Sequence, residues 1–346
     1  MGKTRAGIIN VTGYVGVELA RLLHRHPGVE LTSVTGRSAA GKRLSQVFPH
    51  LASMDMNIEA KLGDVDIVIS AMPHKESARE ILPLLDKGVK VVDISADFRL
   101  RDAGAYPEWY NFTHPAPELL KEAVYGLPEL YSADIASARL VANPGCYPTS
   151  AILALAPAVK EGLVEPEMIV DSKSGTSGAG RSLSLTTHFS EINDDVAAYA
   201  LGGHRHLPEI IQELQLPGSG QASSITFIPH LIPMTRGILT TAYAPLRPEV
   251  IAAGKKGEEE LRNLYLDFYK DAPFVQISET PPHTKQTWGS NFCLIYPTID
   301  HRTGRLIVVS CIDNLIKGAA GQAIQNMNIM LGLPETTGLE ALAIYP

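Results

Sequence analysis

The sequence predicts an α/β protein of two domains, one with a parallel sheet and one of α+β type with a largely antiparallel sheet. Three observations lead to this prediction. The chain has 346 residues, which is long for a single hydrophobic core. Strand and helix patterns alternate through the first half. Strand patterns dominate the second half, without regular helices between them. We expect domains at 1–145 and 146–313, with a C-terminal helix in 314–346 that completes the first.

The chain opens with a strand, a glycine-containing turn, a helix and a second strand, at residues 6–9, 10–16, 17–23 and 29–34. Glycines in the turn would let the backbone approach a pyrophosphate at the helix N-terminus. Asn10 stands where such a turn usually has its first glycine. A glycine-tolerant turn without a ligand is the alternative, but the position in the first βαβ unit favours a dinucleotide site. The candidate cofactor-binding residues of the turn are Gly13, Tyr14, Val15 and Gly16.

The end of the second strand indicates which dinucleotide binds. An NAD site usually has Asp or Glu there, which accepts a hydrogen bond from the ribose 2′-hydroxyl. This chain instead has Gly36, Arg37 and Ser38. An arginine and a hydroxyl suit a 2′-phosphate, so we expect NADP(H) to bind at Arg37 and Ser38. The alternative is that Arg37 is a solvated loop residue.

The rest of the first half continues the alternation, with strand patterns at 67–70 and 89–94 around a helix pattern at 75–85. Loops at the carboxyl ends of these strands should face the cofactor cleft. Pro73 and Arg99 lie in two such loops. Arg99 could bind a substrate anion or simply pair with Asp97 or Asp102.

A seven-residue turn, Asn-Pro-Gly-Cys-Tyr-Pro-Thr at 143–149, follows a strand pattern and precedes a helical run from about residue 150. Cys146 therefore lies near a helix N-terminus, where backbone N–H groups and the helix dipole favour a thiolate. Such a thiolate can attack an acyl carbon. The alternative is a buried structural cysteine.

The second half adds a glycine-rich loop at 174–181, whose N–H groups could bind an oxyanion or phosphate; a flexible surface loop is the alternative. Further on, His204 and His206 flank Arg205. In an extended segment the two rings would point the same way and could bind a metal. No further ligand stands at suitable spacing, so we expect no metal here. A general acid/base beside the Cys146 thiolate is the simpler hypothesis.

Strand patterns recur at 168–173, 224–228, 237–244, 291–295 and 306–312. A helix pattern with an apolar stripe then follows from about 315 to 331. Small residues at 318–321 would permit close packing of this helix, and we expect it to return to the N-terminal domain.

The composition excludes several classes of protein. The net charge of −7 argues against a nucleic-acid surface. The three cysteines form no CxxC pair, which fits a reducing compartment. No signal-peptide block and no run long enough to span a membrane are present. We therefore expect a cytoplasmic protein that binds neither nucleic acid nor membrane.

Taken together, the motifs resemble those of the N-acetyl-γ-glutamyl-phosphate reductases of arginine biosynthesis. The resemblance covers nearly the whole chain. Its motifs are Gly-Tyr-Val-Gly-Val-Glu-Leu at 13–19, Asp-Ile-Ser-Ala-Asp-Phe-Arg-Leu at 93–100, Tyr-Gly-Leu-Pro-Glu-Leu at 125–130, the Cys146 turn, Lys-Ser-Gly at 173–175, Ser-Gly-Ala-Gly-Arg at 177–181, His-Phe-Ser-Glu at 188–191, Gly-His-Arg-His at 203–206, Pro-His-Leu at 229–231, Gly-Ser-Asn at 289–291 and the segment 313–323.

The resemblance implies an NADPH-dependent reduction of N-acetyl-L-glutamyl 5-phosphate to N-acetyl-L-glutamate 5-semialdehyde and phosphate. It makes Cys146 the nucleophile, through a thioester, and the histidine pair the acid/base, with His206 favoured over His204. It places Asn314 near the nicotinamide carboxamide, and it implies a homodimer or homotetramer. With these roles, the expected cofactor-binding set also includes Ser174 and Gly175, and the expected substrate-binding residues are Arg99, Asn143 and Arg205.

Three alternatives remain at this point. A sister family reduces an aminoadipyl or glutamyl phosphate carried on a small acidic protein, but its cysteine turn differs from the one here. A non-enzymatic NADP(H) sensor would need the glycine turn but neither Cys146 nor the histidine pair. A thiol hydrolase or acyltransferase would need no nucleotide-binding unit.

Overall fold

The chain divides into two compact units in the computed structural model, which describes residues 2–215, 223–248, 251 and 254–346. Unit 1 comprises Met1–Gly145 and Ala319–Ala341, and unit 2 comprises Cys146–Gly318 and Leu342–Pro346. The last residues of the chain therefore belong to unit 2. The functional assignment of the two expected domains remains a proposal.

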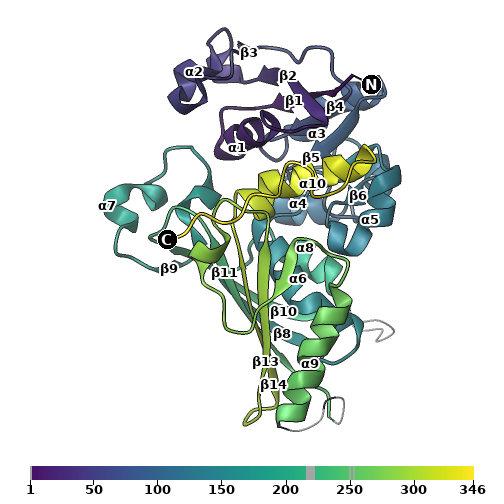
Figure 1. Cartoon of the computed structure of the whole chain (residues 1–346), viewed down its shortest axis with the longest axis vertical. Coiled ribbons are helices and arrows are strands. Elements are labelled where there is room, and N and C mark those ends of the chain that lie inside the picture. Colours follow the sequence, from purple (N-terminus) through teal and green to yellow (C-terminus); the bar gives the residue numbers. More distant parts are fainter. Residues whose placement is uncertain (1, 216–222, 249–250, 252–253) are drawn as a thin grey trace. The chain divides into compact units, whose positions relative to one another are not determined.

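Unit 1 is built on a sheet of seven strands in the order β3-β2-β1-β4-β5-β7-β6, and all of its strand pairs are parallel (Figure 1). This confirms the predicted parallel sheet, and the strand order is of the Rossmann type. Its strands are mostly apolar and buried, as expected for a parallel sheet covered on both faces. The strands are β1 (Thr4–Ile9), β2 (Val29–Thr35), β3 (Ile58–Glu59), β4 (Ile67–Ser70), β5 (Lys90–Asp93), β6 (Val124–Tyr125) and β7 (Leu140–Ala142).

Helices cover both faces of this sheet. Helix α1 (Tyr14–Leu23) connects β1 to β2, and α3 (Ser77–Leu85) connects β4 to β5 in the opposite direction across the sheet. Right-handed crossovers place these two helices on opposite faces. Helix α10 (Gly321–Met330) contacts α1, β5 and α5, so the chain does return to the N-terminal sheet as predicted. The remaining helices of the unit are α2 (Leu44–Val47), α4 (Ala105–Tyr110) and α5 (Pro128–Ser137).

The C-terminal helix lies close to the predicted range of about 315–331, and the rest of the segment 314–346 is not helical. It consists of a π-helical turn, Ile316–Ala320, followed by α10, which ends at Met330. Gly332, with a φ of 69°, and Pro334 follow directly. A left-handed glycine and a proline both terminate helices, which explains why the helix ends at Met330.

Unit 2 contains a mixed sheet in the order β12-β13-β14-β11-β8-β10-β9. Two of its pairs, β12 with β13 and β8 with β10, are parallel, and the other four are antiparallel. The largely antiparallel sheet is thus confirmed. Its strands are β8 (Glu167–Gly175), β9 (Ala197–Ala198), β10 (Ser224–Ile232), β11 (Ile238–Pro245), β12 (Val275–Ile277), β13 (Cys293–Asp300) and β14 (Arg305–Ile312).

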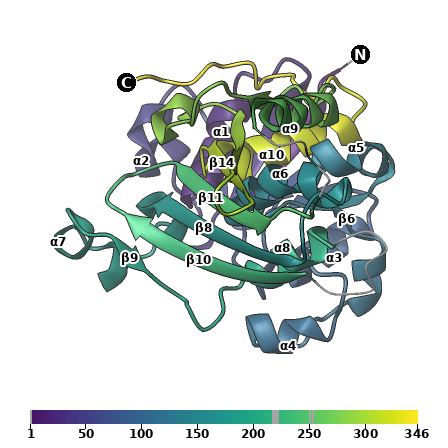
Figure 2. The same ribbon diagram turned by 90° about the horizontal axis from the view of Figure 1, so that it is seen from below.

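Helices pack on one face of this sheet. Helix α6 (Cys146–Lys160) lies against β11, β13 and β14, with α8 (Leu207–Glu213) against β10 and α9 (Lys255–Phe268) against β13 (Figures 1 and 2). Residues along β11 and β13 alternate strictly between buried and half-buried. The half-buried residues therefore form the second face of the sheet. A short helix, α7 (Phe189–Ile192), lies in the segment that leads to β9.

No helix within the described residues is long and apolar enough to cross a membrane.

Candidate functional site

The nucleotide-type turn of unit 1 has the geometry that the glycine pattern predicts. Gly13 caps α1 with extended backbone, and a Cβ added to it would meet no heavy atom within 4 Å. Gly16 packs against the turn, where a Cβ would come within 2.5 Å of the Asn10 carbonyl oxygen and 2.6 Å of the Val11 Cα. Gly13 is thus open for a ligand, whereas Gly16 is closed by packing of the helix on the strand.

Asn10 occupies the place of the missing first glycine because it adopts the same kind of backbone. Its φ is +66°, in the left-handed region that asparagine tolerates better than most residues. Its side-chain amide donates a hydrogen bond of 2.9 Å to the carbonyl of Ala71, and its backbone N–H donates to the Thr35 hydroxyl at 3.3 Å. The substitution therefore preserves the turn.

A cavity of about 260 Å³ lies beside this turn. Arg37 and Ser38 line it from the 3₁₀ turn after β2, and Pro73 lines it from the loop after β4. Arg37 forms ion pairs with Glu76 and with Glu80, the latter at 2.9 Å. The open Gly13 turn and this cation-bearing cavity fit the diphosphate and the 2′-phosphate of an NADP(H) molecule.

Cys146 is the first residue of α6, so this helix begins four residues earlier than the sequence pattern indicated. Its side chain is half-buried. Gly318, in the π-helical turn, lies directly against it, because a Cβ on Gly318 would come within 2.8 Å of the Cys146 Cβ. Cys146 thus has the expected position at a helix N-terminus, where a thiolate is favoured.

The two histidines lie together in unit 2, next to the residue that follows the cysteine. The ring centroids of His204 and His206 are 4.8 Å apart, and they lie 5.7 Å and 5.9 Å from the Tyr147 ring. The segment is a turn before α8 and not an extended strand, so the rings meet by a different route from the one expected. Cys146, His204 and His206 are therefore brought into one neighbourhood through Tyr147.

The turn distinguishes the two rings. His204 Nδ1 accepts a hydrogen bond of 3.0 Å from the backbone N–H of His206. Burial, and secondarily the charge of Arg205, lower the pKa of His204 to about 4. His204 is thus neutral near pH 7, with Nδ1 as acceptor. Its contacts fix the backbone of His206, which leaves His206 as the better candidate for proton transfer.

Two tyrosines complete this neighbourhood, and sequence reasoning missed both. The Tyr199 hydroxyl donates to the Tyr147 hydroxyl at 3.1 Å, and Tyr147 donates to the carbonyl of His230 at 3.2 Å. Burial raises the pKa of Tyr199 to about 12 and also raises that of Tyr147, and the negative charge of a Cys146 thiolate acts in the same direction. Tyr147 follows Cys146 directly in the sequence, and this position could have marked it as part of the site. No sequence feature marks Tyr199 in the same way.

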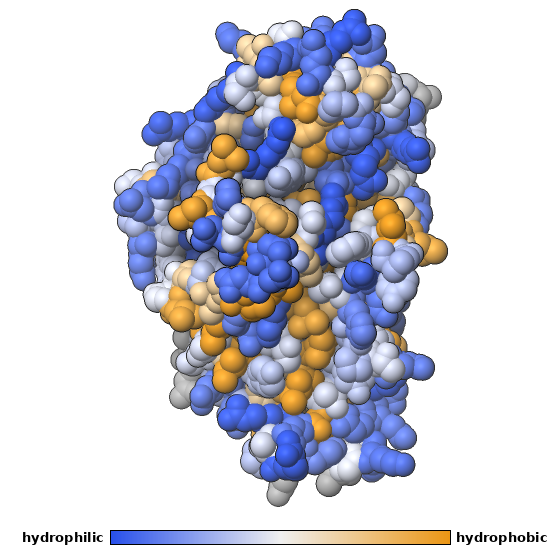
Figure 3. Space-filling model, turned by 90° about the vertical axis from the view of Figure 1, so that its left-hand side faces the viewer, coloured by the Kyte–Doolittle hydropathy of each residue, from blue (hydrophilic) through white to orange (hydrophobic). Residues whose placement is uncertain are grey.

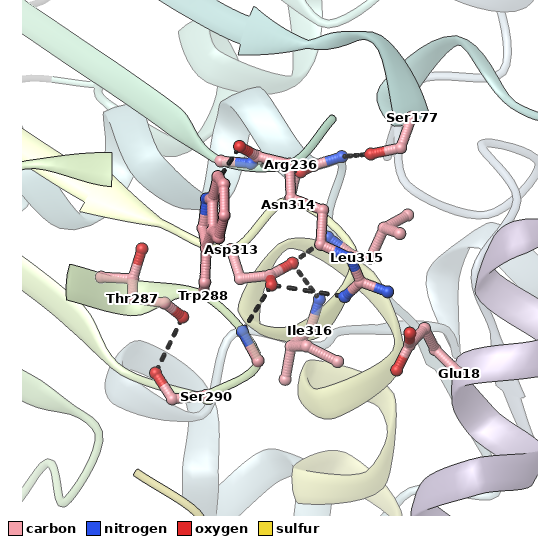
Figure 4. A network of polar contacts seen from close by, with 12 residues as sticks. Glu18, Ser177, Arg236, Thr287, Trp288, Ser290, Asp313, Asn314, Leu315 and Ile316 are labelled. Atoms are coloured by element: carbon pink, nitrogen blue, oxygen red, sulfur yellow. Dashed lines mark hydrogen bonds and ion pairs between the residues drawn. The ribbon is translucent and has the colours of Figure 1, made fainter. Parts of the chain in front are cut away.

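The expected cofactor residues of unit 2 form an anchored loop. Gly175 donates to the carbonyl of Gly237 at 2.9 Å, and a Cβ on it would lie 2.8 Å from the Met234 carbonyl oxygen. The buried Asn314 side chain accepts from the Gly237 N–H at 2.8 Å and donates to the Ser177 hydroxyl at 3.0 Å (Figure 4). Ser174 is buried beside them. Asn314 therefore fixes the position of the 174–178 loop.

Asp313 holds the next part of the same network. One carboxylate oxygen accepts from the backbone N–H groups of Leu315 and Ile316 at 2.8 Å and 3.1 Å. The other accepts from Gly289 N–H at 2.8 Å and lies 3.4 Å from the Arg236 guanidinium (Figure 4). This carboxylate fixes the chain that leads into the π-helical turn, and hence the approach to Gly318.

Arg99 and Asn143 are buried in unit 1, and both form hydrogen bonds with neighbouring parts of the chain. Arg99 donates to the carbonyls of Asn143 and Ile94 at 2.8 Å and 2.7 Å, instead of pairing with Asp97 or Asp102 through these nitrogens. Asn143 accepts from the Asn326 side chain at 3.0 Å. These contacts position the chain just before Cys146, and substrate binding by the two residues remains a prediction. Arg205 is exposed.

Among the described residues, no group of three or more His, Cys, Asp or Glu side chains could hold a metal ion.

Comparison with known proteins identifies the family. The semialdehyde dehydrogenase NAD-binding domain matches residues 5–138, and the semialdehyde dehydrogenase dimerisation domain matches residues 146–314. A relative from Dehalococcoides mccartyi, named N-acetyl-gamma-glutamyl-phosphate reductase, is 61% identical over the full length of both chains. The chain belongs to the N-acetyl-gamma-glutamyl-phosphate reductase family. A family member of that name from Heliobacterium modesticaldum is 50% identical over 99% of both chains.

Solved structures outside this family share the fold. Aspartate semialdehyde dehydrogenase with NADP from Candida albicans has a TM-score of 0.70 at 16% identity, covering 95% of this chain and 99% of the other. Aspartate semialdehyde dehydrogenase II from Vibrio cholerae has a TM-score of 0.68 at 16% identity, covering 96% and 99%. At this identity the likeness concerns the fold alone. The N-acetyl-gamma-glutamyl-phosphate reductase family thus uses the two-domain semialdehyde dehydrogenase architecture.

Proposed function

We propose that this chain reduces N-acetyl-L-glutamyl 5-phosphate to N-acetyl-L-glutamate 5-semialdehyde and phosphate, with NADPH as reductant, in arginine biosynthesis. The full-length relation to proteins named for this reaction is the observation that carries the proposal. The neighbourhood of Cys146, Tyr147, His204 and His206 in unit 2 supports it. Neither the carrier-linked reductase nor the sensor is favoured, since the relatives are named N-acetyl-gamma-glutamyl-phosphate reductase.

Cys146 begins the proposed reaction as a nucleophile. Its thiolate attacks the acyl carbon, the carbon–sulfur bond forms and the carbon–oxygen bond to phosphate breaks, which leaves a thioester. The first turn of α6 stabilises the thiolate before attack. Protonated His206 donates a proton to the departing phosphate. When bound, NADPH supplies the hydride that reduces the thioester carbonyl carbon.

His206, reprotonated from solvent, donates a proton to the oxyanion that hydride transfer leaves, which gives the thiohemiacetal. It takes this proton back as the carbon–sulfur bond breaks and the Cys146 thiolate is released with the semialdehyde. His204 stays neutral and holds the turn, because its Nδ1 accepts the His206 N–H. Arg205 is exposed beside the pair, and we propose that it contacts the carboxylate of the substrate.

We further propose that the chain assembles as a homodimer or homotetramer through unit 2, the unit that matches the dimerisation domain. The sheet face without helices carries half-buried apolar residues, among them Leu239, Leu294, Ile307 and Val309. The α7 segment adds exposed apolar side chains at Leu183, Leu185, Phe189, Val196 and Leu201. Figure 3, which views the molecule from the left-hand side of Figure 1, shows apolar patches among polar side chains. Apolar patches of this kind are typical of association surfaces.

The decisive experiment runs the reaction in reverse. Purified protein is given N-acetylglutamate 5-semialdehyde, phosphate and NADP⁺, and NADPH formation is followed at 340 nm, beside the aminoadipate analogue. We expect NADPH formation that requires phosphate and the acetylated glutamate compound. Reduction that is independent of phosphate, or faster with the aminoadipate analogue, would contradict the proposed function.

A further inference from the structure

The 2′-phosphate end of the cavity in unit 1 contains two acids that the proposed binding of NADP(H) does not use. Arg37 is the cation of the cavity, and its two terminal nitrogens each contact a carboxylate, one from Glu76 and one from Glu80. All three side chains line the cavity. All three are also partly exposed, at 65%, 44% and 48% of the side chain. The acids are therefore accessible to a ligand that reaches Arg37.

The two acids come from one rigid element. Glu76 is the N-cap residue of α3, and Glu80 is four residues further on, so both lie on the same side of the helix. The buried carboxylate of Asp97 anchors the start of this helix, because it accepts hydrogen bonds of 2.7 Å and 3.0 Å from the backbone N–H groups of Lys75 and Ala78. The acids are thus presented to Arg37 from a fixed backbone.

Charge decides what such an arrangement favours. One guanidinium and two carboxylates give the pocket a net charge of −1 before any ligand binds. A phosphate monoester carries about −1.5 to −2 at neutral pH, so it must displace the acids from Arg37 and remain near them. A ribose 2′-hydroxyl needs only an acceptor, and an acid at this end of the sheet serves that purpose in NAD-binding domains.

We propose that Glu76 and Glu80 set the cofactor selectivity of this chain. They compete with the 2′-phosphate of NADPH for Arg37, and they accept a hydrogen bond from the 2′-hydroxyl of NADH. The inference rests on the proposed function, since it concerns the same dinucleotide site. The acids lower the preference for NADPH that Arg37 alone would give. The opposing view is that the two acids only orient Arg37 for the phosphate. On that view, removing their charges weakens the binding of 2′-phosphorylated compounds.

The test is a double variant, Glu76→Gln with Glu80→Gln, which removes two charges and keeps the side-chain shape. Binding of adenosine 2′,5′-bisphosphate, NADPH and NADH is measured by calorimetry, without substrate. The matched control is Glu118→Gln with Glu122→Gln, because these exposed acids of unit 1 also each pair with a cation, Lys121 or Arg139. Both double variants change the net charge equally.

In the Glu76/Glu80 variant we expect the two 2′-phosphorylated compounds to bind roughly tenfold more tightly, because two exposed like charges are removed. NADH should bind no more tightly than before, and the control should match the wild type. Unchanged or weaker binding of the bisphosphate in the Glu76/Glu80 variant would overturn the inference. Equal tightening in the control would overturn it too, since the effect would then be one of net charge.

Arg37→Ala separates this inference from the proposed function. If the wild type binds adenosine 2′,5′-bisphosphate and Arg37→Ala loses roughly 10- to 100-fold in affinity, the phosphate site is where we place it. A failure of the Glu76/Glu80 prediction would then count against the inference alone. If the wild type binds none of the three nucleotides, the proposed cofactor site itself is wrong, and the inference falls with it.

Discussion

The chemistry proposed for this chain depends first on one sulfur atom. Cys146 begins α6 and is half-buried, whereas Cys293 and Cys311 are fully buried in strands. Burial raises the pKa of Cys311 above its usual range, so this thiol is poorly suited to attack a substrate. The structure thus distinguishes one cysteine of the three on exposure and helix position.

We predict that Cys146→Ala abolishes turnover while NADPH still binds. The alanine removes the nucleophile and leaves the Gly13 turn and the Arg37 cavity of unit 1 unchanged. Cys146→Ser should fail as well, because a serine alkoxide is far harder to form than a thiolate near neutral pH. Steady-state rates and calorimetric titration with NADPH check both. Activity within a few-fold of wild type in either variant would remove Cys146 from the mechanism.

The histidine pair gives a second prediction. His206→Asn should lower kcat by roughly 10²- to 10⁴-fold, because a positioned proton-transfer group is lost. It should also remove the titrating limb near neutral pH from the pH–rate profile. His204→Asn should keep that limb and raise KM more than it lowers kcat, since an asparagine oxygen can still accept the His206 N–H. If only the His204 variant loses the limb, the assignment is reversed. Inactivation by EDTA with rescue by zinc would instead indicate a metal.

His204 also predicts a pH dependence of stability. Its pKa is about 4 in the folded chain and 6.5 in the unfolded chain. Between these values the unfolded state binds more protons, so the free energy of unfolding rises with pH across this window. His204→Asn should remove a difference on the order of 1–3 kcal/mol between pH 4 and pH 6.5. Urea unfolding of the wild type and of His204→Asn at pH 4 and pH 6.5 measures this difference. An equal change in the free energy of unfolding in the two proteins would show that His204 has an ordinary pKa in the folded chain.

At the scale of residues, motif spacing predicted the cysteine and the histidines but not the groups around them. Tyr199 and Tyr147 come together only through the fold, since 52 residues separate them. The contacts of Arg99 show what the sequence could not give. Two of its nitrogens donate to backbone carbonyls, which hold the side chain in place, and its binding of a substrate anion stays a prediction. Sequence gives the type of side chain, whereas burial and competing acceptors decide its use.

Among the secondary-structure elements, the contact between α6 and the π-helical turn matters most. Gly318 belongs to the turn Ile316–Ala320, and its backbone N–H donates to the Asp313 carbonyl at 3.0 Å. An extra residue per turn is frequent at functional sites. Asp313 fixes the turn through two backbone N–H groups, so the position of Gly318 against Cys146 is determined by a carboxylate five residues before it.

We predict that Gly318→Ala lowers kcat by on the order of 10²-fold, the cost of a displacement of about 1 Å at a reacting group. The new Cβ would lie 2.8 Å from the Cys146 Cβ and 3.2 Å from its Cα, and neither atom is the end of a flexible side chain. NADPH affinity should stay near the wild-type value. Gly63→Ala is the control, because its Cβ would make only ordinary contacts, the nearest at 3.4 Å. Normal kcat in Gly318→Ala would show that the cysteine tolerates the shift.

The periodic patterns predicted elements well where burial alternates or repeats. The sequence predicted β11 and β14 at nearly their observed bounds, since side chains along each strand point alternately to a covered and an uncovered face of the sheet. Short pieces such as β9 and β12, of two and three residues, have no pattern of their own, and pairing alone defines them. The sequence pattern predicts an ordinary helix where the π-helical turn lies, for a related reason. Its apolar spacing resembles that of an α-helix, and packing decides the extra residue.

At the scale of the whole molecule, the two faces of the sheet in unit 2 differ in what covers them. Its helix-covered face is buried within the chain, whereas the opposite face presents half-buried apolar residues. The strand patterns predicted a largely antiparallel sheet but could not say that helices would cover only one of its faces. A sheet face of this composition is stable when a second protein surface covers it. The match of unit 2 to a dimerisation domain supports a second copy as that surface.

We predict that Val309→Glu weakens self-association by at least tenfold. Val309 is half-buried in β14, beside Thr241 of β11 and Tyr296 of β13, so it lies away from the sheet edges and a covered carboxylate there would have no partner. Leu266→Glu on α9 is the matched control, because it places the same charge on an exposed leucine of a helix that packs on the opposite face. Sedimentation at several concentrations gives the mass, with circular dichroism to confirm folding. A wild-type mass for Val309→Glu would exclude this face as the interface and leave the exposed α7 segment as the other surface to test.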